Sequence, residues 1–554
     1  MTKEAALFSL QIIDELVKQG VTYFCLAPGS RNTPLVLAIA ENPFCETFVH
    51  FDERGLAFHA LGYSMGAKKA CCIVTTSGSA VANLFPAIVE AFQSSIPLIL
   101  LTADRPQEEI DSGSNQTINQ TKIFGSFVHW HLDLTANKNH PARFLPSMIS
   151  HACMLALTKG PVHLNCRFEE PLYPLDFPKK ESSFSSSYSL SKQSFESYSL
   201  PKNKKGLILI GNGEKEALFP IYTLAKKRGF PIFADITSQA KTSPRPFEVI
   251  ENFSWILKCH SMPKPTLVLH FGERFVSKEP FNYLKDTKAE YLHISSSEKR
   301  YDPYFLVTKR LFTTPTAFCH HLVYEEEKEK NWLNLWKEED KNVSKILAQM
   351  QESFEDCEPI FLSTLADSIR DSSLFIGNSM PIRDADSFFH PKKPTGKIFA
   401  NRGASGIDGN IATAIGLAQG MKKHLVAILG DQTALHDSNS LAQLKKAAYP
   451  VTFIIFNNYG GGIFSHLPIK RSKHLEKYFC ATHSFKLEGI CSSFDLPYGK
   501  REELELWLKE KKSGLIEIET NQKKNALFYQ RLSSAILQKP KRQKSLAKDP
   551  FSYL

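Results

Sequence analysis

Two polar strand ends in the last third of the sequence carry side chains suited to holding a divalent cation. Apolar runs over residues 425–430 and 451–457 are typical of neighbouring buried strands, and a helix is predicted between them. Asp431 follows the first run and Asn458 the second. Together with the backbone carbonyl of Gly460, their side-chain oxygens would give Mg²⁺ the ligands it prefers, and diphosphate oxygens would complete the shell. An ordinary β-α-β unit with polar strand ends is the simpler alternative.

The elements that must position these residues follow an alternating pattern from the amino end. An amphipathic helix near residues 4–19 precedes a strand-like run at 21–27, and similar runs follow at 71–75, 97–102 and 160–166. Helical stretches separate them. This alternation predicts an α/β fold in which mostly parallel sheets are flanked by helices.

Changes in composition divide the chain into three such domains. Residues 181–205 are serine-rich and form the clearest linker, and a charged helical stretch at 331–357 forms a second one. The turn at 211–213 lacks the third glycine and the acidic residue of a dinucleotide site, which favours a plain strand-to-helix turn. The predicted parts are a first domain (1–180), a central domain (206–330), a last domain (358–536) and a basic tail (537–554).

Composition excludes several classes of function. The 554 residues are 42% apolar and 22% charged, as in ordinary globular proteins. The net charge of +10 lies partly in the tail, and no basic segment is interleaved with aromatics, so no nucleic-acid partner is expected. No run approaches the ~20 apolar residues of a membrane span, and no signal peptide is predicted. The 11 cysteines have no ligand-like spacing. We therefore expect a soluble, cytoplasmic protein.

The strand-helix-strand segment at 430–461 resembles the thiamine-diphosphate motif, which begins Gly-Asp-Gly and ends in Asn-Asn. Gln432 stands where the motif has its second glycine. The resemblance implies that a buried glutamate interacts with the aminopyrimidine ring of the cofactor, because burial keeps the shared proton from water. Asp52 and Glu53 end a predicted strand just before a small-residue-rich helix, and Glu53 is the preferred candidate. Either acid could instead cap the helix.

Longer motifs resemble the family of 2-succinyl-5-enolpyruvyl-6-hydroxy-3-cyclohexene-1-carboxylate synthases, the thiamine-diphosphate enzymes of menaquinone biosynthesis. The matching stretches are APGSRNTPL (27–35), HFDERGLAFHALG (50–62), TTSGSAVANL (75–84), LLTADRP (100–106), GNSMPIRD (377–384), NRGASGIDG (401–409) and NNYGGGIFSHLP (457–468). The resemblance implies pyrimidine-binding, central and diphosphate-binding domains in a homodimer or a dimer of dimers. Each cofactor would lie between the first domain of one subunit and the last domain of another.

The same resemblance implies how the cofactor is held. Glu53 would be the catalytic group, and Asp431, Asn458 and Gly460 of the partner chain would bind Mg²⁺ or Mn²⁺. Ile407 would be an apolar prop that bends the cofactor. The expected cofactor contacts are Glu53, Ser77, Gly78, Ser379, Ile407, Gly430, Asp431, Gln432, Asn458 and Ile463.

The reaction implied by the resemblance is that of a transferase that forms a carbon–carbon bond. It decarboxylates 2-oxoglutarate and adds the succinyl-semialdehyde carbanion to isochorismate. Each substrate carries two carboxylates, which arginine binds bidentately. The family's central Lys-Arg pair corresponds here to Lys278-Glu279, and Arg274 could compensate. The expected substrate contacts are Ser30, Arg31, Arg105, Gln116, Lys278, Ser379, Arg383 and Arg402.

Two other interpretations stay open at this point. A thiamine enzyme for a smaller 2-oxo acid, such as an acetohydroxyacid synthase or a simple decarboxylase, would keep the cofactor residues without needing the arginine-bearing motifs. A catalytically silent α/β protein would bind a ligand or partner without turnover. The presence of Glu53, Asp431 and Asn458 argues against the silent protein. A surface salt bridge is the alternative for any one arginine taken alone.

Overall fold

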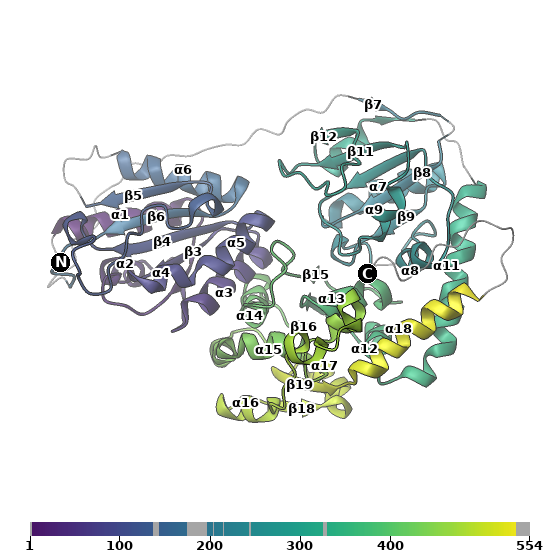
Figure 1. Cartoon of the computed structure of the whole chain (residues 1–554). Coiled ribbons are helices and arrows are strands. Elements are labelled where there is room, and N and C mark those ends of the chain that lie inside the picture. The colour runs from purple at the N-terminus through teal and green to yellow at the C-terminus, as the bar shows by residue number, and fades with distance from the viewer. Residues whose placement is uncertain are drawn as a thin grey trace.

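Three α/β units, each built on one parallel sheet, make up the chain (Figure 1). The computed structural model describes residues 3–136, 143–173, 197–202, 204–213, 215–242, 245–324, 330–369 and 371–538. Every strand pairing among them is parallel. The predicted fold class is therefore confirmed. Most of the predicted linker at 181–205 and nearly all of the tail at 537–554 lie outside the described residues, and the domain boundaries stay predictions.

The first unit has a six-stranded sheet in the order β2-β1-β3-β4-β6-β5. Apolar clusters cover both faces, which explains why its strands are nearly continuous apolar runs. The strands are β1 (Tyr23–Leu26), β2 (Glu46–Val49), β3 (Cys71–Thr75), β4 (Leu98–Asp104), β5 (His131–Thr135) and β6 (Val162–Arg167). The helices are α1 (Lys3–Lys18), α2 (Thr33–Ala40), α3 (Glu53–Ala67), α4 (Ser79–Asn83), α5 (Phe85–Ser94) and α6 (Phe144–Lys159).

The second unit has a five-stranded sheet in the order β12-β11-β10-β8-β9. Residues 211–213 follow β8, and a short 3-10 helix at Lys215–Ala217 precedes the next α-helix. The strands are β8 (Gly206–Ile210), β9 (Ile232–Ala234), β10 (Leu267–Phe271), β11 (Glu290–Ser295) and β12 (Lys309–Phe312), with a separate pair β7 (Tyr198–Ser199) and β13 (Leu322–Val323). The helices are α7 (Leu218–Arg228), α8 (Phe253–Cys259), α9 (Glu279–Leu284), α10 (Pro315–His320) and α11 (Lys330–Met350), which is the charged stretch predicted to be helical.

The third unit has a six-stranded sheet in the order β15-β14-β16-β17-β19-β18. Its strands are β14 (Ser373–Ile376), β15 (Ile398–Phe399), β16 (Leu425–Gly430), β17 (Val451–Asn457), β18 (Tyr498–Lys500) and β19 (Gly514–Glu519). Its helices are α12 (Glu358–Ser368), α13 (Met380–Phe388), α14 (Asn410–Met421), α15 (Asp431–His436), α16 (Leu487–Ser493), α17 (Leu504–Glu510) and α18 (Gln522–Leu537). Because β16 and β17 pair in register from Leu425↔Val451 to Gly430↔Phe456, their carboxyl ends meet at one edge of the sheet.

Helices α3 and α14 cross closely and join the first unit to the third (Figure 1). Glycines allow this approach. A Cβ atom at Gly62 would lie 2.0 Å from the carbonyl oxygen of Thr413, and one at Gly416 would lie 1.9 Å from that of His59. The two helix backbones are therefore in direct contact, and any larger side chain at these positions would push them apart.

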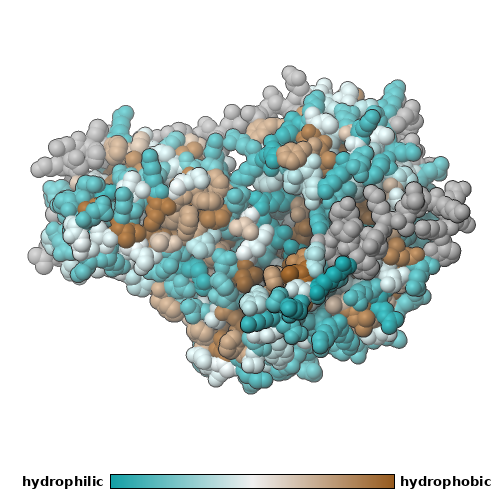
Figure 2. Space-filling model, viewed as in Figure 1, coloured by the Kyte–Doolittle hydropathy of each residue, from teal (hydrophilic) through white to brown (hydrophobic). Residues whose placement is uncertain are grey.

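The surface of the first unit carries apolar side chains on the face shown in Figure 2. Large apolar residues exposed in this unit include Phe44, Phe51 and Phe85. Phe51, which is 63% exposed, stands two residues before Glu53. Among the described residues, no helix combines the length and the apolar character needed to span a membrane.

Candidate active site

Asp431 and Gly460 are in direct contact at the carboxyl edge of the third sheet. The backbone N–H of Gly460 donates to Oδ2 of Asp431 at 2.8 Å, and that of Gln432 donates to Oδ1 at 2.6 Å. Asn458 joins them in lining a cavity of about 40 Å³. The three residues predicted to hold a cation are thus brought together, because two adjacent parallel strands end beside one another.

The backbone around this cavity leaves room for a phosphate. Gly460 has a φ of +154°, and a Cβ atom there would lie 2.8 Å from the carbonyl oxygen of Cys480. A Cβ atom at Gly430 would meet no heavy atom within 4 Å, so the space in front of that residue is open. A carboxylate, an amide and glycine backbone fit a hard divalent cation that carries a diphosphate.

His483 is a partner of Asp431 that sequence reasoning missed. Its Nε2 lies 3.1 Å from Oδ2 of Asp431, and both side chains are buried. Burial raises the pKa of the Asp431 carboxyl, and the two backbone N–H groups and His483 act in the opposite direction. No local motif marks His483, which comes from a loop 52 residues away in the sequence.

Gln432 has a definite structural task at the position where the thiamine motif has glycine. Its Nε2 donates to the carbonyl oxygens of Cys480 at 2.9 Å and Ala481 at 3.1 Å. The N–H of Gly461 also donates to the Cys480 carbonyl, at 2.6 Å. The side chain therefore ties the Cys480–Ala481 segment to the edge of the cation cavity.

Most of the other cofactor residues predicted in the third unit line the same cavity. Ser379 precedes α13 with a φ of 71° and a ψ of −128°, a conformation that is costly for any residue with a Cβ atom. Such strain is common at functional sites. The predicted residues that line the cavity are Ser379, Ile407, Gly430, Asp431, Gln432, Asn458 and Gly460. Ile463 stands directly after Gly462, which also lines it.

Glu53 is separate from this cavity within one chain. It is the first residue of α3 and half-buried, and Nδ2 of Asn83 lies 3.5 Å from its Oε2. Asp52 takes the capping role, since its side chain accepts hydrogen bonds from the N–H groups of Arg54 and Gly55. Glu53 is therefore not used as the cap. Among the residues that the structure describes, none from the first unit lines the cation cavity.

The turn at Ser77 and Gly78 is locked onto a neighbouring loop of the first unit. Ser77 Oγ donates to the carbonyl oxygen of Gln116 at 2.9 Å, and Gln116 Nε2 donates to that of Ser77 at 3.0 Å. The N–H of Gly78 donates to Oε1 of Gln120 at 2.9 Å. The structure therefore brings together three predicted residues and adds Gln120, a fully buried side chain that the sequence did not single out.

Two predicted substrate arginines of the first unit converge on one carboxylate. Arg31 donates to the Phe168 carbonyl at 2.8 Å and to Oε1 of Glu170 at 3.0 Å, and Arg105 lies 3.9 Å from the same oxygen. Burial, and then the charge of Arg105, lower the pKa of Arg31. The Glu170 side chain is 69% exposed, so an incoming carboxylate could replace it between the two arginines. Ser30 is exposed beside Arg31.

The third unit presents a second pair of arginines. Nη1 of Arg402 donates to Oδ1 of Asn378 at 2.7 Å, and Arg383 donates to the carbonyl of Ser379. Burial, and then the positive charge of Arg383, lower the pKa of Arg402. An anion between them would relieve this repulsion.

Lys278 and Arg274 of the second unit differ in their contacts. Lys278 is exposed at the start of α9. Arg274 donates to the carbonyl oxygens of Arg402, at 2.9 Å, and Gly403. Its guanidinium therefore holds the backbone of the NRGASGIDG motif, in addition to any contact it makes with a substrate.

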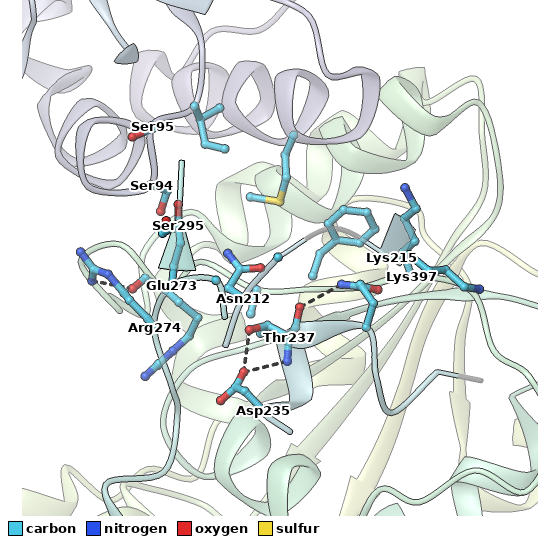
Figure 3. A pocket seen from close by; sticks show the side chains of 18 of the residues that line it. Ser94, Ser95, Asn212, Lys215, Asp235, Thr237, Glu273, Arg274, Ser295 and Lys397 are labelled. Atoms are coloured by element: carbon cyan, nitrogen blue, oxygen red, sulfur yellow. Dashed lines mark hydrogen bonds between the residues drawn. The ribbon is translucent and has the colours of Figure 1, made fainter. Parts of the chain in front are cut away.

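A larger cavity lies elsewhere, where the three units meet (Figure 3). It measures about 550 Å³ and is lined by Asn212, Arg274 and Ser295 of the second unit together with residues of the other two. Neither Asp431 nor Asn458 lines it. Arg402 borders it and donates to Asn378, the residue before the strained Ser379.

Comparison with known proteins identifies the same three-part organisation. Residues 8–123 match the thiamine pyrophosphate enzyme N-terminal TPP binding domain, 181–376 the middle domain of thiamine pyrophosphate enzymes, and 381–515 the C-terminal TPP binding domain. Three relatives bear the name 2-succinyl-5-enolpyruvyl-6-hydroxy-3-cyclohexene-1-carboxylate synthase. The chain is 34% identical to that of Chlorobaculum parvum (95% of this chain, 96% of the relative), 35% to that of Roseiflexus sp. (90% and 91%) and 34% to that of Salinibacter ruber (96% and 96%).

Proposed function

The chain belongs to the family of 2-succinyl-5-enolpyruvyl-6-hydroxy-3-cyclohexene-1-carboxylate synthases, and from this membership we propose its substrates, its metal and its assembly. It decarboxylates 2-oxoglutarate and joins the remaining four-carbon unit to isochorismate, as a step of menaquinone biosynthesis in the cytoplasm. Thiamine diphosphate and Mg²⁺ or Mn²⁺ are its cofactors. It works as a homodimer or a dimer of dimers.

The convergence of Asp431, Asn458 and Gly460 around one cavity is the observation that carries this proposal. Asp431 and Asn458 offer side-chain oxygens and Gly460 a backbone carbonyl, so these residues would hold the cation and, through it, the diphosphate. When bound, thiamine diphosphate supplies the electron sink for decarboxylation. Ile407 lines the same cavity and supports the cofactor by apolar contact.

Glu53 of a second subunit holds a proton at the aminopyrimidine ring. This assignment is supported by the absence of first-unit residues from the lining of the cation cavity. It is also supported by the exposure of Phe51 next to Glu53, since an apolar side chain there gains from being covered by a partner chain. A partner that covers Phe51 would also exclude water from Glu53 and favour a shared proton.

The arginines bind the carboxylates of the two substrates. Arg31 and Arg105 form one site around Glu170, and Arg383 and Arg402 form another. Arg31 is buried and Arg105 and Arg402 are half-buried, whereas Arg383 is exposed. A charge-assisted fork to a carboxylate is stronger at the buried positions than in water. Ser30, Gln116, Lys278 and Ser379 complete the set of proposed substrate contacts.

The test is a turnover assay with both substrates. Purified protein is incubated with thiamine diphosphate, Mg²⁺, 2-oxoglutarate and isochorismate, and the loss of isochorismate is followed together with the release of CO₂. We expect both only when all four components are present. A matched assay with pyruvate in place of 2-oxoglutarate separates this function from that of a thiamine enzyme for smaller 2-oxo acids. If the folded, cofactor-loaded protein leaves isochorismate unchanged, the proposal is wrong.

A further inference from the structure

Strand β17 leads into two adjacent asparagines, and a different buried glutamate holds each of their amides. Nδ2 of Asn457 donates to Oε1 of Glu517 at 2.6 Å. Nδ2 of Asn458 donates to Oε1 of Glu358 at 2.9 Å. Glu358 and Asn458 line the cation cavity, whereas Glu517 and Asn457 do not. The two pairs therefore have the same chemistry and different positions relative to the cation.

Glu358 is fixed by hydrogen bonds whose directions are unambiguous. Its backbone N–H, which can only donate, donates to Oδ1 of Asn525 at 3.1 Å and so defines the orientation of that amide. Nδ2 of Asn525 then donates back to Oε1 of Glu358 at 2.8 Å, and Thr520 Oγ1 donates to the same oxygen at 2.7 Å. Glu358 is buried, with a residue exposure of 2%.

This arrangement leaves Asn458 with one orientation of its amide. The group that faces the Glu358 oxygen must be the NH₂, so Oδ1 faces the other way. Gln522 Nε2 donates to the backbone carbonyl of Asn458 at 3.1 Å and to its Oδ1 at 3.2 Å. A carbonyl oxygen has two lone pairs, so Oδ1 keeps one of them for a cation.

We propose that Glu358 is a positioning residue that holds the Asn458 amide so that its oxygen, and not its NH₂, is presented to the cation. The inference rests on the proposed function, in which Asn458 is a cation ligand. It extends the site to α12 and α18, since Asn525 of α18 keeps Glu358 in place. If the amide turned over, its NH₂ hydrogens would face the cation and exclude it.

Glu517 provides the matched comparison within the same chain. Besides Asn457 it accepts hydrogen bonds from the Tyr498 hydroxyl and from Lys500, and Oδ1 of Asn457 accepts from the N–H of Tyr459 at 3.1 Å. This pair shapes the loop after β17 without reaching the cavity. Glu517→Gln therefore imposes the same chemical change on a buried glutamate–asparagine pair while leaving Asn458 untouched.

The experiment measures Mn²⁺ affinity by electron paramagnetic resonance in the presence of excess thiamine diphosphate. It compares wild type, Glu358→Asp, Glu358→Gln, Glu517→Asp and Glu517→Gln after circular dichroism has checked each fold. Glu358→Asp moves the oxygen away from Asn458, and we expect it to weaken Mn²⁺ binding by about 10- to 100-fold, as the loss of supporting groups around metal ligands does. Glu358→Gln keeps an oxygen in the place of Oε1, which accepts the side-chain hydrogen bonds, so its loss of affinity should be smaller. Both Glu517 variants should bind Mn²⁺ as wild type does.

Activity provides a second readout that a general loss of stability would not reproduce. Saturating Mn²⁺ should restore most of the turnover of Glu358→Asp, because the defect lies in binding the cation. Wild-type affinity in a folded Glu358→Asp protein would overturn the inference while the proposed function stands. If wild type itself binds no Mn²⁺ alongside thiamine diphosphate, the proposed cation site is wrong and the inference fails with it. If Glu358→Asp does not fold, Glu358→Gln decides the question, and an Mn²⁺ affinity equal to that of Glu517→Gln would overturn the inference.

Discussion

The two ends of the proposed cofactor site differ in how much of each is assembled within one chain. At the cation end, Asp431 receives hydrogen bonds from two backbone N–H groups and contacts His483, and the surrounding residues enclose a cavity. At the proton-transfer end, Glu53 is half-buried and has a 3.5 Å contact with Asn83. Under the proposed function, one chain would prepare the metal site by itself, whereas Glu53 would depend on what a second chain adds.

The contact between α3 and α14 fixes the first unit, which carries Glu53, against the third unit. Glycines at Gly62 and Gly416 bring the two helix backbones together. Glu90 of α5 adds a second link, since its carboxylate accepts hydrogen bonds from the N–H groups of Gly403 at 2.7 Å and Ala404 at 2.6 Å. These contacts tie the first and third units, and under the proposed function Glu53 would therefore serve the cation cavity of a second chain.

The largest expected effect is that of Glu53→Gln on turnover. The substitution keeps the size of the side chain but removes the group that shares a proton, so we expect turnover to fall by about 10²- to 10⁴-fold. Mn²⁺ affinity should stay at its wild-type value, because the cation end is complete without Glu53. Single-turnover kinetics and Mn²⁺ titration measure the two properties separately. Unchanged turnover would contradict the role given to Glu53.

Mixing two inactive variants tests most directly whether the two ends of the site come from different chains. Glu53→Gln and Asp431→Ala each damage one end of the site, and a hybrid dimer would contain one site built from the two intact ends. Random association of equal amounts should restore about a quarter of wild-type activity, since half of the dimers are hybrids and each has one intact site.

The mixture should be prepared by co-expression with two affinity tags, and the doubly tagged species, which should have about half of the wild-type activity, should be assayed. Glu53→Gln combined with itself under two tags is the control. If the hybrid is as inactive as its parents, each site is built from a single chain and the difference between the two ends has no functional meaning.

The sequence singled out Asp431 and Asn458, which line the cavity, but not the side chains that hold them in place. The bounds of β16 and β17 coincide with the apolar runs 425–430 and 451–457, because strands buried on both faces are continuous apolar segments. Asp431 and Asn458 follow from those runs and from their shared edge. His483 and Glu358 could not be found in this way, since they reach the site from a loop and from a helix start far along the chain.

The first-unit end illustrates a second limit. The motif around Glu53 is local, and the sequence left open which of two adjacent acids caps α3. The structure settles this point, because the Asp52 side chain bonds the helix N–H groups. Whether a given arginine pairs with protein or with substrate depends on distances across the fold, such as the approach of Arg31 and Arg105 to Glu170.

An intermediate effect is expected when the contact between the two units is overpacked. Gly416→Ala places a methyl group against the His59 carbonyl, and we expect it to lower the free energy of unfolding by about 1–3 kcal/mol. Gly489→Ala in α16 is the matched control, because a Cβ atom there meets nothing within 4 Å, and helix propensity favours alanine by up to ~1 kcal/mol. Denaturant unfolding compares both variants with wild type. Equal stability of Gly416→Ala and wild type would show that the units are not held by this crossing.

The smallest effect is expected at Asp52, and it separates the two adjacent acids. Asp52→Ala removes the cap of α3 and should cost about 1 kcal/mol of stability, whereas Asp52→Asn keeps a capping oxygen and should cost less. Because the Asp52 side chain bonds the backbone of α3 and not a ligand in this arrangement, turnover per folded molecule should change far less than in Glu53→Gln. Thermal unfolding and turnover of both variants measure this difference. If Asp52→Asn lost as much turnover as Glu53→Gln, assigning the proton to Glu53 and not to Asp52 would be wrong.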